Sequence, residues 1–174
     1  MSAFQKTVAH WRAGLAVALV ATGLALSAPA SVLAQEMDDY TRASLSYELT
    51  LPKVEAYAKA LEDMGGWARK NPADAQRMRT LKPTRTLDEA VRQIENVPGL
   101  KLILNGNGLT GADMALIPLV IVSGVGGHMM EQRGIALPAG RINTSALALV
   151  RANPARMDAL SQRIQTARQA LSGQ

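Results

Sequence analysis

Cysteine is absent from the 174-residue chain, and aromatic residues make up only 3% of it. Disulfides therefore cannot stabilise the fold, and haem attachment through cysteine is excluded. Only two histidines are present, so a zinc site would need mostly carboxylate ligands. The core must be built from aliphatic residues, alanine and methionine, a composition that suits helices better than sheets.

The first 34 residues contain Lys6 and Arg12 and no acidic residue. An apolar run over 13–26 follows, and then small residues up to Ala34. This order is typical of a secretory signal peptide, and the run is shorter than the ~20 residues of a membrane-spanning helix. We predict cleavage after Ala34, with cleavage after Ala30 as the alternative. The product is expected to be periplasmic or secreted, with no transmembrane segment after cleavage.

Charge is mild in the predicted mature chain, residues 35–174. Loss of Lys6 and Arg12 lowers the formal net charge from +5 to +3. This value does not predict nucleic-acid binding. The acidic start of the segment 35–48 predicts a loose, partly extended arm, and residues 49–174 are predicted to form a single helical domain of a size that can bury its own core.

Apolar residues at helical spacing predict three outer amphipathic helices, over 50–70, 86–96 and 154–172. Caps are predicted at Thr50 for the first of these helices and at Asn71 for a short helix that follows it. The first helix should bend or break at Gly65-Gly66, because glycine weakens a helix. The last helix carries a regular apolar stripe and a basic outer face. The stripe comprises Met157, Leu160, Ile164, Ala167 and Leu171, and the basic face Arg156, Arg163 and Arg168.

The stretch 108–134 predicts an apolar central helix. Thr110 and Asp113 have the spacing of a capping box, and every residue over 114–122 is apolar. A helix without a polar face should be surrounded by other helices. Pro118 predicts a kink. At the glycines over 124–127 the helix either ends near Ser123 or continues to Glu131 with a neighbour crossing closely over the bare backbone; we favour continuation. The fold class is thus an all-α, small irregular helical bundle around one apolar central helix.

Several short motifs resemble a family of small exported bacterial all-helical proteins to which no activity is assigned. The motifs are Leu49-Thr50-Leu51-Pro52-Lys53, Arg69-Lys70-Asn71-Pro72, Gly108-Leu109-Thr110 and Arg151-Ala152-Asn153. They lie at helix boundaries and together cover most of the predicted mature chain. The resemblance implies export and an all-α fold, and it brings no catalytic residues.

The residues that could bind a metal ion or take part in catalysis lie around the glycines of the predicted central helix. His128, Met129 and Met130 are candidate metal ligands, because imidazole and thioether suit Cu(I); equally, methionines fill gaps in an aromatic-poor core. Ser123 lacks the glycine two positions earlier that a nucleophile elbow needs. The glycines follow a predicted helix without a nearby Lys-Ser or Lys-Thr, which argues against a phosphate loop.

These observations favour a non-enzymatic binding or protein-interaction module without a cofactor. Its partner would be a protein, bound on the basic face of the last helix, or a small apolar ligand. The alternative is a small metal- or lipid-handling periplasmic protein that uses the region 123–130.

Overall fold

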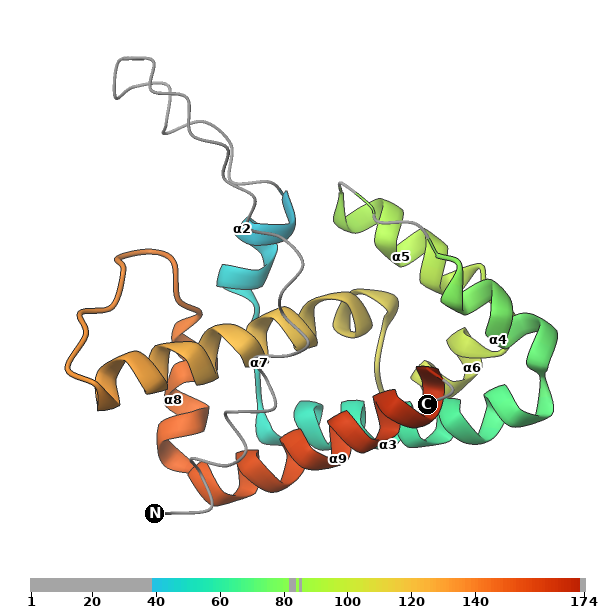
Figure 1. Ribbon diagram of the computed structural model, residues 1–174. Coiled ribbons are helices and arrows are strands. Elements are labelled where there is room, and N and C mark those ends of the chain that lie inside the picture. The colour runs from blue at the N-terminus through green and yellow to red at the C-terminus, as the bar shows by residue number, and fades with distance from the viewer. Residues whose placement is uncertain (1–38, 82–83, 85, 173–174) are drawn as a thin grey trace, which may run out of the picture. The chain divides into compact units, whose positions relative to one another are not determined.

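The computed structural model describes residues 39–81, 84 and 86–172, and this part of the chain is helical, without a strand (Figure 1). The predicted all-α bundle is confirmed. The predicted signal peptide lies outside the described residues. The helices are α2 (Asp39–Ser46), α3 (Leu51–Lys70), α4 (Pro72–Arg79), α5 (Leu87–Glu95), α6 (Leu100–Gly106), α7 (Gly111–Gln132), α8 (Thr144–Ala152) and α9 (Pro154–Ser172).

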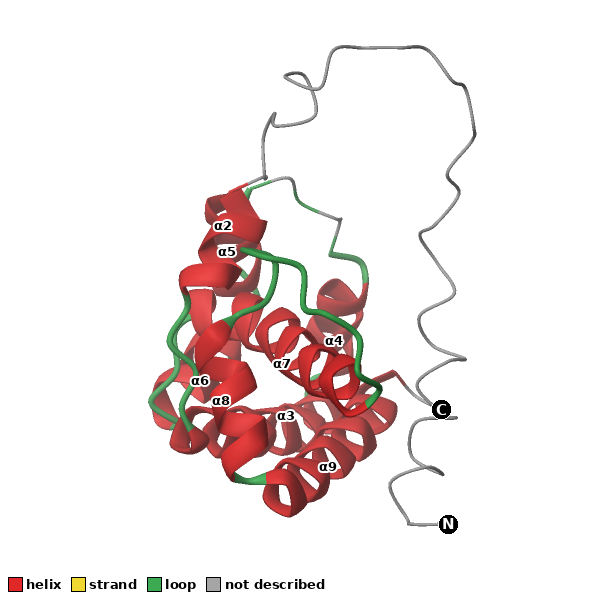
Figure 2. Cartoon of the chain, turned by 90° about the vertical axis from the view of Figure 1, so that its left-hand side faces the viewer, coloured by secondary structure: helices red, strands yellow, loops and turns green. Residues whose placement is uncertain are grey.

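Helix α7 is the centre of the bundle and contacts α2, α3, α5, α6 and α8 (Figures 1 and 2). Its capping box forms as predicted. The backbone amide of Asp113 donates to Thr110 Oγ1 over 3.1 Å, and Asp113 Oδ2 accepts from the Thr110 amide over 2.8 Å. The helix runs through Pro118 and the glycines to Gln132, so continuation is confirmed. By length and composition α7 could cross a membrane. The core helix of a helical bundle meets the same criteria, and α7 contacts five other helices, as such a core helix does.

The crossing of α8 over α7 depends on one glycine above all. A Cβ atom on Gly124 would lie 2.7 Å from the carbonyl carbon of Ala146 in α8. At Gly127 it would lie 3.0 Å from Ile142 Cγ2, and at Gly126 it would have no neighbour within 4 Å. The absence of a side chain at Gly124 therefore allows the two backbones to approach closely.

Helices α3 and α9 pack side by side and run parallel. Arg156 pairs with Glu55 and Arg163 with Glu62, and both pairs join residues 101 positions apart, as a parallel register requires. The whole predicted apolar stripe of α9 is buried. The break that was one predicted outcome at Gly65-Gly66 does not occur, because contacts of α3 with α9, α6 and α4 outweigh ~1 kcal/mol per glycine.

The segment before α3 also differs from the prediction. Residues 39–46 form α2 rather than a loose arm, and only the next few residues are extended. Thr50 and Asn71 make no side-chain cap bond to the helices that follow them. Instead, Asn71 Nδ2 donates to the carbonyl oxygen of Trp67 over 3.0 Å and so closes the end of α3.

Candidate functional site

Asn143, at the start of α8, is a highly connected polar side chain, and only 1% of its surface is exposed. Its Nδ2 donates to the carbonyl oxygens of Ser44 and Tyr47, both over 2.7 Å, and of Leu45 over 3.2 Å. Its Oδ1 accepts from the backbone amide of Ala146 over 2.8 Å and caps α8. One side chain thus fixes the end of α2 to the start of α8.

Two serines extend this arrangement. Ser145 Oγ accepts from the Leu49 amide over 3.0 Å and donates to the Tyr47 carbonyl oxygen over 3.1 Å. Ser123 Oγ, on α7, accepts from the backbone amide of Asn143 over 2.9 Å. The structure does not bring Ser123 together with His128, whose Nε2 lies 3.0 Å from Gln132 Nε2 on the same helix. The Ser123 hydroxyl therefore binds the start of α8, and it is not paired with His128 as a nucleophile would be with a general base.

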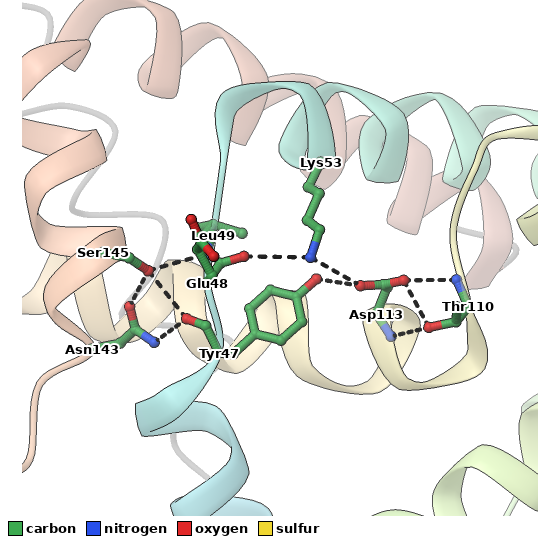
Figure 3. A network of polar contacts seen from close by, with 8 residues as sticks. All are labelled: Tyr47, Glu48, Leu49, Lys53, Thr110, Asp113, Asn143 and Ser145. Carbon is green, nitrogen blue, oxygen red and sulfur yellow. Dashed lines mark hydrogen bonds and ion pairs between the residues drawn. The ribbon is translucent and has the colours of Figure 1, made fainter.

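The other half of the network is centred on the carboxylate of Asp113 (Figure 3). Tyr47 donates its hydroxyl proton to Asp113 Oδ1. The backbone amide and the hydroxyl of Thr110 donate to Oδ2 over 2.8 and 2.7 Å. Lys53 Nζ lies 3.7 Å from Oδ1 and 4.4 Å from the centroid of the Tyr47 ring, a cation–π distance.

Protonation states follow from these contacts. Burial alone would raise the pKa of Asp113, but hydrogen bonds from Tyr47 and Thr110 and the charge of Lys53 outweigh burial and hold it below its usual value. Burial, followed by the hydrogen bond to Asp113 and the charge of its carboxylate, raises the pKa of Tyr47. The pair is therefore an ionised carboxylate and a protonated phenol at neutral pH.

We call Tyr47, Lys53, Thr110, Asp113, Asn143 and Ser145 the polar clamp. Their polar atoms are engaged with one another and with backbone groups of the segment between α2 and α3, as Figure 3 shows. A carboxylate that accepts three hydrogen bonds and faces a lysine is fixed in place. The clamp accordingly joins α2, α3, α7 and α8 and has a structural role.

The candidate metal ligands lie near the end of α7. Consecutive residues of a helix point about 100° apart, so His128, Met129 and Met130 do not face a common point. His128 Nδ1 is buried and has no hydrogen-bond partner. No group of three histidine, cysteine, aspartate or glutamate side chains suited to a metal ion occurs among the described residues. The unpartnered Nδ1 leaves one ring nitrogen of His128 available to a ligand.

An apolar groove lies between α2, α5 and α7, with a volume of about 470 Å³. Its lining includes Tyr40 of α2, Ile94 of α5, and Ala115, Pro118 and Leu119 of α7. We call it the α2–α5–α7 groove. The prediction that α7 has no exposed face is wrong, because Leu119 is 46% exposed in the groove and Val122, one turn further, is 43% exposed. The described helices leave this side of α7 open.

The predicted basic face of α9 lies along the seam with α3. Arg156 and Arg163 form ion pairs with Glu55 and Glu62, and Arg168 donates to the hydroxyl of Tyr57 over 3.0 Å. A shallow hollow of about 610 Å³ follows this seam over small residues such as Gly65 and Ala167. Much of the positive charge on α9 is thus already compensated within the fold.

No family model, no curated protein and no solved structure matches this chain. The functional assignment therefore depends on the residues and the geometry described above.

Proposed function

We propose that the protein is exported and acts as a non-enzymatic interaction module that binds an amphipathic polypeptide segment in the α2–α5–α7 groove. The observation that carries this proposal is the open side of α7, where Leu119 and Val122 are 46% and 43% exposed on the most apolar helix described. Exposed aliphatic residues grouped along one helix are typical of an interaction surface.

The form of the groove favours a polypeptide over a lipid chain. Among the described residues the groove is open along one side, and its lining is uncharged and mostly apolar, with Thr84 and Gln93 as polar members. An acyl chain laid in it would keep much of its surface in water. An amphipathic helix would instead bury its apolar face against Leu119 and Ile94 and keep its polar face hydrated, as in helix-in-groove complexes.

Binding is tested with a fluorescent amphipathic helical peptide of leucine and lysine, and with a fluorescent fatty acid as the lipid probe. Fluorescence anisotropy should show binding of the peptide to the wild-type protein. Leu119→Lys should weaken binding at least about ten-fold, because a charge would face the apolar side of the peptide. Leu102→Lys is the matched control, since Leu102 is 76% exposed on α6 and does not line the groove.

Equal affinity of the peptide for the wild type and for Leu119→Lys would contradict the proposal. Binding of the fatty acid without binding of the peptide would support the lipid-handling alternative in its place.

Metal handling at 123–130 remains the second candidate, favoured by the buried, unpartnered Nδ1 of His128. Cu(I) is the probe. A site at His128 requires that Cu(I) raise the melting temperature of the wild-type protein and not that of His128→Ala. An equal response of both proteins would remove the metal proposal.

Export is tested separately by native mass spectrometry of the protein isolated from the exported fraction of the cell. The mass distinguishes cleavage after Ala34 from cleavage after Ala30, and an added mass would identify a resident ligand. A full-length mass in the cytoplasmic fraction would contradict export.

A further inference from the structure

The loop between α7 and α8, residues 133–142, combines features that the groove does not explain. From Arg133 to Arg141 its sequence is Arg-Gly-Ile-Ala-Leu-Pro-Ala-Gly-Arg, an apolar stretch with an arginine at each end. Ile135 is 49% exposed, and all residues from Arg133 to Arg141 are exposed except Leu137, which is half-buried. Figure 1 shows this loop, in orange, extending away from α7 before the chain returns to α8.

Hydrogen bonds define both ends of the loop. The amides of Gly134 and Ile135 donate to the carbonyl oxygens of Glu131 and Met130, both over 2.9 Å, and Gly134 has φ +69°. This is a Schellman ending of α7. The far end closes with a turn in which the Arg141 amide donates to the Pro138 carbonyl oxygen over 3.2 Å. Gly140 there has φ +66°. The apolar residues are thus presented between two fixed turns.

The charges within the loop have one sign. Arg133 and Arg141 are exposed, and neither guanidinium pairs with a carboxylate among the described residues. After Glu131, which is paired with Arg151, the next acidic residue along the chain is Asp158. The loop therefore carries uncompensated positive charge beside exposed aliphatic side chains.

From this combination we infer that the loop docks the protein on the surface of an anionic phospholipid bilayer. Ile135 and Leu137 would enter the acyl boundary while Arg133 and Arg141 bind lipid phosphates. Between the arginines the loop has no polar side chain that could specify a protein partner, whereas a bilayer requires only an apolar layer beneath a layer of anions. Insertion stays interfacial, because the backbone groups of a loop cannot be satisfied in hydrocarbon.

The test is co-sedimentation of the purified full chain, as isolated, with vesicles of phosphatidylcholine alone or mixed with phosphatidylglycerol. Binding should require phosphatidylglycerol and weaken as the ionic strength rises. Arg133→Gln and Arg141→Gln should each lower the partition coefficient about five-fold at low ionic strength. Ile135→Ser should lower it about ten-fold, through lost burial of an aliphatic side chain.

Matched controls remove the same chemistry elsewhere on the surface. Lys70→Gln deletes one exposed positive charge at the end of α3, and Leu102→Ser deletes an aliphatic side chain that is 76% exposed on α6. Neither should change the partition coefficient. Because the N-terminal apolar run is the same in all variants, any binding that it causes is common to all of them.

Insertion of the loop into the bilayer is measured separately, by the fluorescence of a tryptophan placed in the loop. Ile135→Trp should show a blue shift of its emission with phosphatidylglycerol vesicles beyond that of the wild type, because Trp11 and Trp67 are common to both proteins. The inference is overturned if the wild type does not bind anionic vesicles at low ionic strength, or if the loop variants and the control variants bind equally. It is also overturned if Ile135→Trp binds without a blue shift beyond that of the wild type, which would indicate electrostatic adsorption of the loop alone. The outcome is independent of the peptide experiment, which addresses the groove.

Discussion

The hydroxyl of Tyr47, in the extended segment after α2, donates a hydrogen bond to the carboxylate of Asp113, in the first turn of α7. Sixty-six positions separate the two residues in the sequence. The bond connects the capping box of the central helix to the segment that leads into α3, so the start of α7 and the path of the chain before α3 should be energetically coupled.

This coupling is measurable with a double-mutant cycle. Tyr47→Phe should lower the free energy of unfolding by about 2 kcal/mol, since it leaves a buried carboxylate oxygen with one donor fewer. Asp113→Ala should cost about 3 kcal/mol, because it also removes the capping box. The double variant should cost clearly less than the sum when measured by urea denaturation. Strict additivity would show that the bond contributes nothing.

Acid should weaken the fold partly through Asp113. Its pKa in the folded protein lies below its usual value, so its stabilising contribution is complete above the unfolded pKa of about 4 and is lost as the pH falls through the folded pKa. Urea denaturation across this range should give a shallower acid limb for Asp113→Asn than for the wild type. Asp63→Asn is the exposed comparison: hydrogen bonds from Lys59 and Asn107 also lower that pKa, but water screens it, so the effect should be smaller.

The α7–α8 crossing makes opposite predictions for two glycines two positions apart. Gly124→Ala should destabilise the protein by about 2 kcal/mol, because its methyl group would collide with the backbone of Ala146. Gly126→Ala has open space and should stabilise the protein by up to about 1 kcal/mol through helix propensity. Urea denaturation of the two variants tests both predictions, and equal changes in their free energy of unfolding would contradict the close crossing.

Asn143 should be the most sensitive polar position. Asn143→Ala removes the α8 cap, the donor to the carbonyl oxygens of Ser44 and Leu45, and one of the two donors to the Tyr47 carbonyl oxygen, so a loss of about 3 kcal/mol is expected. Hydrogen exchange should also show faster opening of α2.

Asn153→Ala is the control, because that side chain donates only to the Leu149 carbonyl oxygen over 3.2 Å and should cost under about 1 kcal/mol. A similar loss in both variants would contradict the clamp.

Features that depend on neighbours in the sequence were predictable. The stripe of α9 and the capping box of Thr110 and Asp113 are patterns within one or a few turns, and both are present.

Features that depend on distant residues were not predictable. Helix α2 is held by Asn143, which lies 98 and 99 positions away from the two α2 residues that it binds, and no short motif records that contact. The open side of α7 escaped prediction for a different reason. Residues 114–122 are uniformly apolar, so the sequence has no periodicity that distinguishes the side under α8 from the side that carries Leu119.

The parallel pairing of α3 with α9 has a consequence for the order of folding. Glu55 and Glu62 meet partners 101 residues later, so this half of the core cannot close until the final helix has been synthesised and released. Contacts of such long sequence separation slow folding. If the chain is exported before it folds, the late pairing of α9 with α3 would keep this half of the core open during export.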